Sequence, residues 1–309
     1  MEKVNVIITG GSGFIGKDLL KKIDLSVFSV RLITREKQKL YHLEKEGFEV
    51  IEADLSDVNS LKNAFSGQSI LLNLAAEVRN LELLEKTNVQ GTQNLIEAIE
   101  ACGIKKVIHL SSVGVVGKGY SISQLVVTEE TSAKPANAYE RTKKKSEDLL
   151  IAAEQKGNFE LTILRPTNVF GESHPFNALL NLSQHLSSGR IVPYMKNAVV
   201  NYVYVSDVSA SILYFLNSQE KGIYQIGSSM NLRDFLDLMQ RSLRKKARLF
   251  KVPKLFIILA NTLGLKLFSS VSNSVIYSDE KLRKIFHYPV GIEQGIINTL
   301  NDFENKKRL

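Results

Sequence analysis

The sequence predicts an α/β protein whose central parallel sheet is covered by helices on both faces. Four runs are apolar almost throughout: VNVIIT (4–9), VFSVRLIT (27–34), SILLNLAA (69–76) and KKVIHLSS (105–112). Strands of this kind are buried on both sides, and the helical segments between them connect parallel strands. The cluster TGGSGFIG, at the first passage from strand to helix, is typical of the doubly wound Rossmann type of this architecture.

The remaining elements of this half follow from the periodicity of the chain. Further strands are expected at FEVIEAD (48–54) and FELTILRP (159–166), which are short apolar and β-branched runs. Helices are expected from Phe14 to Ile23, from Leu84 to Cys102, and over 136–154. Strands and helices therefore alternate through this half of the chain, as a parallel sheet requires.

The pattern loosens after Gly171, where short segments such as GIYQIG (222–227) are mixed with helices and no linker is present. We expect residues 1–171 to form the main domain and residues 172–309 a smaller portion, parts of which return to the main domain. Ligands of doubly wound folds bind at the carboxyl ends of the strands. The smaller portion is therefore predicted to bind a substrate there.

The composition argues against several classes of protein. With 309 residues, of which 44% are hydrophobic and 23% charged, the chain has a soluble globular profile. Its net charge of +8 suits an anionic small ligand. Because no basic stretch is interleaved with aromatic residues, nucleic acid is not expected as a partner. The five histidines lack the spacing of metal ligands, so no metal site is expected.

Two features bear on cellular location. Cys102 is the single cysteine, so no intramolecular disulfide can form, which suits a reducing compartment. The N-terminal segment MEKVNVIITGG enters a strand without the basic and apolar regions of a signal peptide. A cytoplasmic protein without a transmembrane segment is therefore expected.

The most apolar stretch is LFIILANTLGLKLF (255–268). It is interrupted by Asn261 and Lys266 and is too short to cross a bilayer. One interpretation is a buried helix or a subunit contact. The other is a helix that lies on a membrane surface, flanked by Lys251 and Lys254.

The glycine cluster predicts a dinucleotide site. Gly10, Gly13 and Gly16 stand where a tight turn, a close approach to a pyrophosphate and helix–strand packing each require glycine. The helix that follows offers unpaired N–H groups and the positive end of its dipole to phosphate. Phe14 and Ile15, in its first turn, are expected to contact the cofactor as well.

The end of the second strand predicts the choice of cofactor. Chains that bind NAD usually carry Asp or Glu there, which grips the ribose hydroxyls. Here LITREKQK places Thr34 and Arg35 at this point. A carboxylate would repel the 2′-phosphate of NADP(H), whereas a guanidinium attracts it and binds two of its oxygens. NADP(H) is therefore predicted over NAD(H), the alternative being that Arg35 is a solvated loop charge.

The segment ANAYERTKKKSEDLLIAAE places Tyr139 and Lys143 four residues apart on one face of a helix. A free phenol titrates near pH 10, about three units above neutrality. A nearby ammonium and a positive oxidised nicotinamide would both favour the phenolate and lower the pKa of the phenol. Such pairs are common in helices, so this segment alone does not distinguish a proton donor with its cation from ordinary surface residues.

Together these residues resemble the extended short-chain dehydrogenase/reductase family, in its NAD-dependent epimerase/dehydratase group. The resemblance covers nearly the whole chain. Besides TGGSGFIG and YERTK, the matching segments are ADL, NLAAE, TNVQGTQNL, HLSSVGVVG, LRPTNVFG, NYVYVSDV and SDEKLRKIFHYP.

The resemblance implies cofactor contacts beyond the glycine cluster and Arg35. In the family, the residues matching Asp54 and Leu55 flank the adenine. The other implied contacts are Leu74, Ala75, Ala76, Asn88, Tyr139, Lys143 and Pro166.

The resemblance also implies three catalytic residues. Tyr139 would be the acid/base, and Lys143 its partner, which also holds the nicotinamide ribose. The family places a Ser or Thr five residues before the glycine that closes its segment. Counting back from Gly117 gives Ser112 and leaves Ser111 as a buried hydroxyl at a strand end. Ser112 would hydrogen-bond the substrate oxygen and the phenol, which fixes the geometry for hydride transfer.

The reaction is narrowed by positions at which the family varies. Dehydratases place an Asp-Glu pair directly after the catalytic hydroxyl residue, where this chain has Val113 and Gly114, so a dehydratase is rejected. Glu77 is a candidate base and substrate contact, with a structural role as the alternative. Reduction of a keto sugar is favoured over 4-epimerisation, because net reduction consumes NADPH and Arg35 favours that cofactor.

A nucleotide sugar is the expected substrate. Asn168 and Arg283 resemble residues that contact the diphosphate in nucleotide-sugar enzymes. One departure is Val200, where the family often has arginine, and Lys196 or Arg190 are candidates to replace it. The apolar stretch also resembles relatives that reduce flavonoid-like or steroid-like ketones, which are the alternative substrates.

Family members commonly pair through two helices per subunit, so a homodimer is expected. A non-catalytic NADP(H)-binding regulator is the remaining alternative. Such proteins typically lose the tyrosine or the lysine, whereas Ser112, Tyr139 and Lys143 are all present here.

Overall fold

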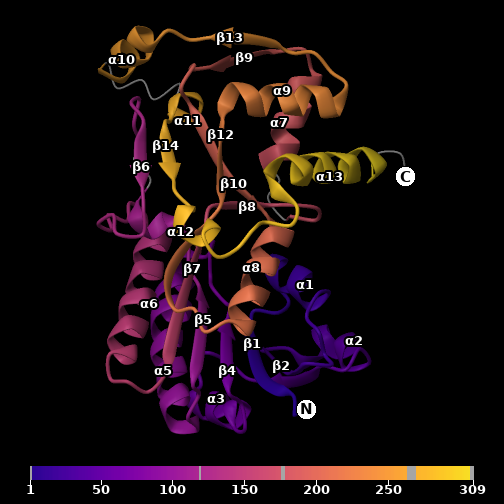
Figure 1. Cartoon of the computed structure of the whole chain (residues 1–309), viewed down its shortest axis with the longest axis vertical. Helices are drawn as coiled ribbons and strands as arrows, with labels where there is room; N and C mark the ends of the chain where they lie inside the picture. Colours follow the sequence, from indigo (N-terminus) through magenta and orange to yellow (C-terminus); the bar gives the residue numbers. More distant parts are fainter. Residues whose placement is uncertain (1, 118–119, 175–177, 263–268, 307–309) are drawn as a thin grey trace. The chain divides into compact units, whose positions relative to one another are not determined.

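The computed structural model describes residues 2–117, 120–174, 178–262 and 269–306 (Figure 1). The chain forms two compact units, each built from three segments of the sequence. The first unit comprises Met1–Gly117, Ser132–Pro166 and Ser209–Tyr224, and the second comprises Lys118–Thr131, Thr167–Val208 and Gln225–Leu309. The chain crosses between the two units several times. The crossing nearest to the predicted boundary at residue 171 comes after Pro166, where the segment Thr167–Val208 of the second unit begins.

The main sheet is a doubly wound parallel sheet, which confirms the predicted fold class. Its seven strands have the order β11-β7-β5-β4-β1-β2-β3, and every pairing from β7 to β3 is parallel. The chain adds β2 and β3 on one side of β1 and then β4, β5 and β7 on the other. The strands are β1 (Val4–Thr9), β2 (Phe28–Thr34), β3 (Glu49–Glu52), β4 (Ile70–Asn73), β5 (Lys106–Leu110), β7 (Glu160–Pro166) and β11 (Gly222–Ile226).

One face of this sheet carries a continuous apolar row. Ile7, Leu71, Val107 and Leu161 stand in register on β1, β4, β5 and β7, and each is buried. Three helices cover this row with buried side chains such as that of Phe65. They are α3 (Val58–Phe65), α5 (Gly91–Cys102) and α6 (Ala138–Glu154).

The other helices of the first unit complete the double winding. Figure 1 shows α1 (Phe14–Leu20) and α8 (Val205–Asn217), which belongs to this unit from Ser209 onward, on the side of the strands away from α5 and α6. The end of α8 is tied to the sheet, because Lys106 Nζ donates to the carbonyl oxygens of Phe215 and Ser218 at 2.6 Å. Short elements are η1 (Lys37–Leu40), α2 (Tyr41–Glu44), α4 (Leu81–Leu84) and η3 (Val113–Val116).

The predicted helix 84–102 is present with a difference in its winding. The helical span starts at Leu81, and between α4 and α5 it forms a π-helix, η2 (Glu85–Gln90). A π-turn rotates the following side chains relative to a regular α-helix and is frequent at functional sites. Here it places Asn88 in the interior, where the side chain is buried. Periodicity does not reveal this turn, because the contacts of Asn88 with Glu77 and Thr142 join separate segments of the chain.

The described residues of the second unit form three small sheets. Their strand orders are β12-β10-β8, β13-β9 and β14-β6. The strands are β6 (Leu125–Val127), β8 (Asn168–Phe170), β9 (Ile191–Tyr194), β10 (Val199–Tyr204), β12 (Ser228–Asn231), β13 (Arg248–Lys251) and β14 (Val275–Tyr277). The helices are α7 (Ala178–Ser187), α9 (Leu232–Leu243), α10 (Lys254–Thr262), α11 (Ser269–Ser272), α12 (Glu280–Arg283) and α13 (Gly291–Lys306).

The long helix α13 is held against β10 by two local features. A Cβ atom on Gly295 would lie 2.7 Å from the Tyr204 ring, so the close approach of helix to strand requires glycine. Asp207 accepts the backbone N–H groups of Val290 and Gly291 at 2.9 Å, which fixes the start of the helix. These contacts explain how α13 is anchored within the second unit.

The apolar stretch 255–268 forms α10 in its first part, and residues 263–268 lie outside the described residues. Ile257 and Ala260 are buried, whereas Leu255, Phe256, Ile258 and Leu259 are exposed. A fully buried helix is therefore wrong for α10. Within the described ranges, no helix has both the length and the hydropathy needed to cross a membrane.

Candidate active site

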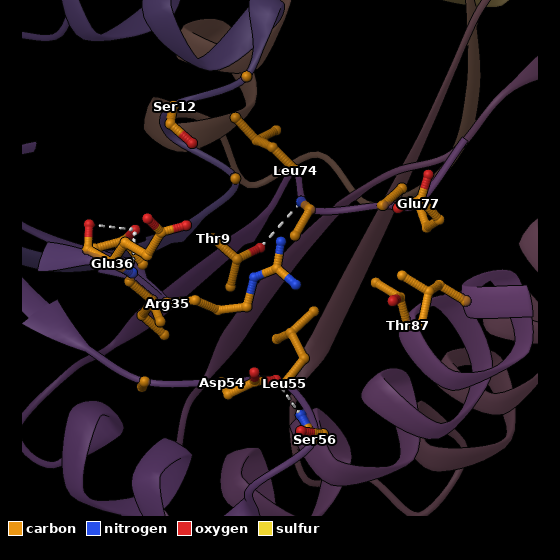
Figure 2. Close-up of a pocket in the computed structure, with 18 of the residues that line it drawn as sticks. Thr9, Ser12, Arg35, Glu36, Asp54, Leu55, Ser56, Leu74, Glu77 and Thr87 are labelled. Atoms are coloured by element: carbon orange, nitrogen blue, oxygen red, sulfur yellow. Dashed lines mark hydrogen bonds between the residues drawn. The ribbon is translucent and has the colours of Figure 1, made fainter. Parts of the chain in front are cut away.

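A pocket of about 360 Å³ lies in the first unit at the carboxyl ends of β1, β2 and β4 (Figure 2). In a doubly wound sheet this is where the strand order reverses and where ligands bind. The pocket brings together many of the predicted cofactor residues, namely Gly10, Gly13, Arg35, Asp54, Leu55, Leu74, Ala75 and Ala76. Its lining also includes Thr34 and Lys39 of the segment LITREKQK, and Thr9, Ser12, Glu36, Lys86 and Thr87, which the sequence analysis did not assign to the site.

The glycine cluster allows close backbone contacts beside this pocket. Gly10 has a φ of +71°, and a Cβ atom there would lie 2.7 Å from the backbone nitrogen of Ala75. A Cβ atom on Gly16 would lie 2.5 Å from the carbonyl oxygen of Gly10. The Gly13 N–H donates to the same oxygen at 3.0 Å. Gly10 thus has no room for a side chain, and Gly16 permits the close packing of α1.

We expect Gly10→Ala to weaken NADPH binding by more than about tenfold, because the new methyl group displaces the end of β4 from the pocket. A fluorescence titration of NADPH measures this effect. Gly67→Ala is the matched control, since Gly67 has a φ of +75° but no atom within 4 Å of the added Cβ. Both variants carry the same left-handed strain of about 1–2 kcal/mol. Equal NADPH affinity in the two variants would refute the steric explanation.

Arg35 follows β2 directly and extends into the pocket, as Figure 2 shows. Its charge acts on two carboxylates of the lining. The pKa of Asp54 is lower than usual. Partial burial alone would raise this pKa, but hydrogen bonds from Ser56 and the charges of Arg35 and Lys86 lower it by more. The pKa of Glu77 is lowered mainly by hydrogen bonds from backbone N–H groups, first that of Arg79, and the charge of Arg35 adds to this shift. The pocket therefore combines a guanidinium with ionised carboxylates.

Glu36 is an acidic lining residue next to Arg35. Its carboxylate accepts a hydrogen bond from Lys39 Nζ at 2.6 Å. Its backbone N–H donates to the Thr34 hydroxyl at 3.2 Å. The sequence shows Glu36 as an acidic residue directly after Arg35. Because Glu36 lines the pocket, it bears on the choice between NAD(H) and NADP(H).

Glu77 and Asn88 have structural contacts in the first unit. The Glu77 carboxylate accepts the backbone N–H groups of Val78, Arg79 and Asn80 at 2.9–3.0 Å, and these bonds lower its pKa. The Asn88 amide accepts from Glu77 N–H at 2.8 Å and donates to the Glu77 carbonyl at 2.9 Å. These bonds favour the structural alternative for Glu77 and account for the burial of Asn88.

Tyr139 and Lys143 lie on α6, whose first turn is capped by Asn137, which accepts the Glu140 N–H at 2.9 Å. Ser112 caps η3 in the same way, by accepting the Gly114 N–H at 3.1 Å. Helix α6 packs against η3. A Cβ atom on Gly114 would lie 3.0 Å from Glu140, so glycine permits this approach. The Ser112 segment and the start of α6 are therefore neighbours.

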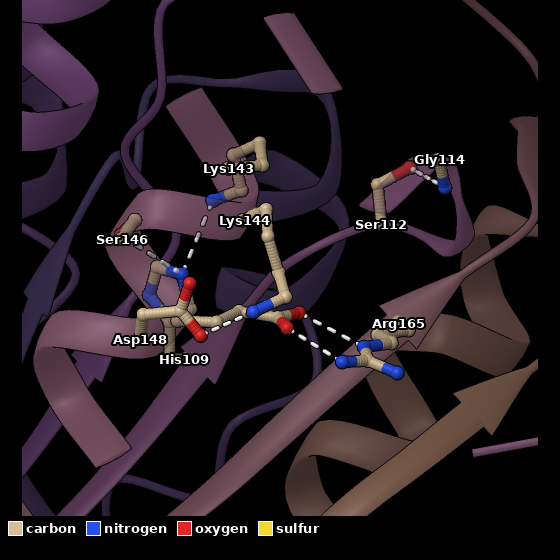
Figure 3. A network of polar contacts seen from close by, with 9 residues as sticks. His109, Ser112, Gly114, Lys143, Lys144, Ser146, Asp148 and Arg165 are labelled. Carbon is tan, nitrogen blue, oxygen red and sulfur yellow. Dashed lines mark hydrogen bonds and ion pairs between the residues drawn. The ribbon is translucent and has the colours of Figure 1, made fainter. Parts of the chain in front are cut away.

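Lys143 is buried in a polar network that the sequence analysis missed (Figure 3). Its Nζ atom donates to the Leu110 carbonyl at 2.8 Å and lies 3.2 Å from His109 Nε2. The other ring nitrogen of His109 lies 3.0 Å from Asn73 Nδ2. A neutral imidazole carries one N–H, so its tautomer is coupled to the charge of Lys143. The sequence feature that could have indicated this network is His109, a polar residue within the apolar strand β5.

This network reaches the pocket through Thr9, whose hydroxyl donates to Asn73 Oδ1 at 2.6 Å and accepts from Ala75 N–H at 3.2 Å. Burial lowers the pKa of Lys143 to about 8, although the negative charge of Glu147 opposes the shift. Burial, together with the charge of Lys143, holds the pKa of His109 well below its usual range. His109 is therefore neutral at pH 7.

Burial, with the adjacent Glu140 charge, raises the pKa of Tyr139 to about 12. The predicted lowering of this pKa is therefore wrong for the chain alone, because burial disfavours the phenolate and the Glu140 charge adds to the same shift. The same prediction also invoked a positive oxidised nicotinamide, whose charge would favour the phenolate of Tyr139 once the cofactor is bound. Ser111 is buried at the end of β5, as predicted, and among the described residues its hydroxyl has no hydrogen-bond partner.

The predicted substrate residues Asn168 and Arg283 belong to the second unit. Asn168 and Ser228 stand in register on either side of Tyr202. Arg283 donates to Ser228 at 2.9 Å and to Asp279 at 2.8 Å. Ser228, which accepts this hydrogen bond, lies two strands away from Asn168, about 10 Å across the sheet.

The two candidates to replace the arginine absent at Val200 lie elsewhere in the second unit. Lys196 lines a separate pocket with Lys251 and Lys254. Arg190 directly precedes β9, on another sheet. No metal site is visible either, since the described residues contain no cluster of three His, Cys, Asp or Glu side chains that could bind an ion.

Comparison with known proteins adds to this geometry. The model of the NAD dependent epimerase/dehydratase family matches residues 6–227. A similar protein is N-acetyl-alpha-D-glucosaminyl-diphospho-ditrans,octacis-undecaprenol 4-epimerase of Escherichia coli O157:H7, which is 30% identical over 263 residues, 81% of this chain and 75% of that protein. The decarboxylating sterol-4-alpha-carboxylate 3-dehydrogenase of Saccharomyces cerevisiae is 28% identical over 184 residues, 55% of this chain and 53% of that protein.

Solved structures show the same fold. UDP-glucose 4-epimerase of Thermus thermophilus, in complex with NAD, has a TM-score of 0.72 and 22% identity over 97% of this chain and 99% of its own. UDP-glucose 4-epimerase of Thermotoga maritima, with UDP-glucose, has a TM-score of 0.76 and 20% identity over 98% of this chain and 100% of its own. The doubly wound sheet, the glycine-lined pocket and the family match over most of the chain lead to one conclusion. This chain belongs to the NAD-dependent epimerase/dehydratase family of extended short-chain dehydrogenases/reductases.

Proposed function

We propose that this protein is an NAD(P)-dependent oxidoreductase that reduces a keto group on a nucleotide sugar, with NADPH as the hydride donor. The observation that carries the proposal is the Arg35 side chain in a dinucleotide pocket without a carboxylate at Thr34. A guanidinium there binds the 2′-phosphate of NADP(H), and NADPH serves net reductions. The bound nicotinamide would supply the hydride.

The chain's own residues would handle the proton. Tyr139 would give its phenolic hydrogen to the substrate oxygen as hydride arrives at the adjacent carbon. Lys143 would hold positive charge one helical turn away and stabilise the phenolate that remains. Ser112 would bind the same substrate oxygen and set its distance from the reacting centres. Val113 and Gly114 lack the acid pair of dehydratases, so dehydration is not proposed.

Asn168 and Arg283 would bind the diphosphate of the substrate. Arg283 is prepared for this role by Asp279, Ser228 and the Tyr288 ring, which lies 5.0 Å from its guanidinium carbon. An arginine fixed by neighbours loses less side-chain entropy when it binds an anion. We further propose a cytoplasmic homodimer, which gel filtration and cell fractionation test.

The second candidate reaction is 4-epimerisation, which the names of the Escherichia coli and Thermus thermophilus relatives favour. Its substrate would be a sugar diphosphate in which the sugar is oxidised and then reduced on its other face. Glu36 in the pocket also favours this reaction, because an acid there suits the ribose hydroxyls of NAD. Because one relative is a sterol dehydrogenase, a steroid-like ketone remains an alternative substrate for this protein.

We expect wild-type protein to bind NADPH more tightly than NADH, and Arg35→Ser to weaken NADPH binding by about 10–100-fold, because a charge-assisted bidentate contact is lost. NADH affinity should change little. Equilibrium dissociation constants for both cofactors measure the effect. Arg241→Ser is the control, since Arg241 is an exposed arginine of the second unit. Tighter binding of NADH by the wild type would refute the cofactor proposal.

A survey by mass spectrometry tests the substrate class. Wild-type protein and NADPH are incubated with UDP-linked keto sugars, UDP-sugars and aromatic or steroidal ketones. We expect a keto sugar to gain two mass units as NADPH absorbance at 340 nm falls. A UDP-sugar that changes its retention at constant mass would support the epimerase instead. Reduction of ketones alone would overturn the nucleotide-sugar proposal.

A further inference from the structure

We propose that the second unit docks onto an anionic membrane surface through the exposed part of α10 and the basic stretch that precedes it. This proposal is independent of the reaction proposed above. It rests on three observations, which concern sequence charge, exposed apolar side chains and the arrangement of β9 and β13.

The charged residues around β13 and the start of α10 are all basic. Between Leu238 and Thr262 the chain has seven lysines and arginines and no aspartate or glutamate. All seven basic side chains are exposed: Arg241, Arg244, Lys245, Lys246, Arg248, Lys251 and Lys254. The whole chain has a net charge of only +8, so the rest of its charge is nearly balanced. Clusters of four to eight basic residues next to an amphipathic helix are typical of contact with anionic lipids.

The adjoining helix presents apolar side chains to solvent. Leu255 is 77% exposed and Leu259, one turn later, 58% exposed. Phe256 and Ile258 are 53% and 41% exposed, whereas Ile257 is fully buried and holds the helix to its unit. A helix with a buried anchor and a wide exposed apolar surface beside basic residues suits insertion at the boundary of headgroups and acyl chains.

The two-stranded sheet extends the same combination. Arg248 pairs with Ile191 and Phe250 with Pro193, so these four residues lie on one face of the ribbon. Ile191 and Phe250 are 58% and 56% exposed, while Val192 is buried. Figure 1 shows that β13 runs from the end of α9 to α10 with β9 beside it. Basic and apolar side chains thus follow one another along connected elements of the second unit.

The chemistry of this surface favours a membrane over two other occupants. A second copy of the chain brings the same seven positive charges, which repel in a two-fold contact. Single-stranded nucleic acid uses aromatic side chains for base stacking. The exposed side chains of α10 are mainly aliphatic, and aliphatic groups are what an acyl layer accepts.

Flotation with vesicles tests the proposal. Vesicles of phosphatidylcholine alone are compared with vesicles in which two fifths of the lipid is phosphatidylglycerol, at low and at high salt. We expect the wild-type protein to float with the anionic vesicles, to ignore the neutral ones, and to be released as salt screens the charges. Lys245→Gln/Lys246→Gln/Arg248→Gln should weaken binding about a hundredfold. Leu255→Ser/Leu259→Ser should weaken it about tenfold or more.

Matched controls lie in the first unit. Lys21→Gln/Lys45→Gln/Lys105→Gln removes three exposed charges, and Leu81→Ser removes an exposed leucine. Both should bind like the wild type. The proposal is overturned if the wild type ignores anionic vesicles or if the α10 and control variants bind equally. It is also overturned if Leu255→Ser/Leu259→Ser only converts a dimer to a monomer, or if mixed-sequence single-stranded DNA binds and vesicles do not.

Discussion

Replacing Tyr139 by phenylalanine is expected to lower kcat by about 10²–10⁴-fold while the dissociation constant of NADPH stays within a few-fold of the wild type. The substitution removes one hydroxyl and keeps the ring, so the packing at the start of α6 is preserved. The phenol is the proposed proton donor, and the structure raises its pKa to about 12 in the chain alone. It therefore holds its proton at neutral pH.

Turnover is measured as the fall of NADPH absorbance with the keto sugar that the survey identifies, and binding by fluorescence. Tyr41→Phe is the matched control, since Tyr41 is 51% exposed on α2 of the same unit. The control should keep full activity. If Tyr139→Phe retained activity within a few-fold of the wild type, the assignment of the proton donor would be wrong.

Replacing Arg165 by leucine is expected to lower the free energy of unfolding by about 3–5 kcal/mol, because it leaves a buried carboxylate unpaired. Arg165 donates to the two oxygens of Glu147 at 2.9 and 2.6 Å, and both side chains are almost fully buried. This ion pair joins β7 to the middle of α6. Urea unfolding, followed by circular dichroism, measures the loss.

The double variant Arg165→Leu/Glu147→Leu should recover much of the stability, since no charge remains buried. Lys145→Leu is the control, because its ion pair with Glu85 is exposed and exposed pairs contribute less than about 1 kcal/mol. A loss below about 1 kcal/mol in Arg165→Leu would contradict the expected cost of a buried unpaired charge.

The sheet was predictable because its strands are buried on both faces and therefore leave uninterrupted apolar runs in the sequence. The glycine cluster was predictable because its spacing reflects steric needs of the backbone, and a Cβ atom on Gly10 would indeed lie 2.7 Å from the backbone nitrogen of Ala75. The family match and the fold confirm these inferences. Both signals are local, so they survive in the sequence without knowledge of tertiary structure.

Other features depend on contacts between distant segments. The pKa of Tyr139 depends on burial that a helix pattern does not show. The approach of Lys143 to His109 joins α6 to β5, 34 residues apart. The π-turn at Asn88 is tied to bonds with Glu77 and Thr142. Neither composition nor periodicity encodes such pairings, and the roles of the catalytic residues stay predictions.

Deuterium transfer is the most direct test of the central claim that this protein transfers hydride from a nicotinamide to a sugar. The wild-type protein is incubated with the responsive keto sugar and NADPH that carries deuterium at both C4 positions, and the mass of the product is measured by mass spectrometry. We predict one deuterium atom in the sugar for each NADPH oxidised, and labelling that is about 10²–10⁴-fold slower with Tyr139→Phe. Bound NADPH that never labels any sugar, keto or otherwise, would contradict the claim.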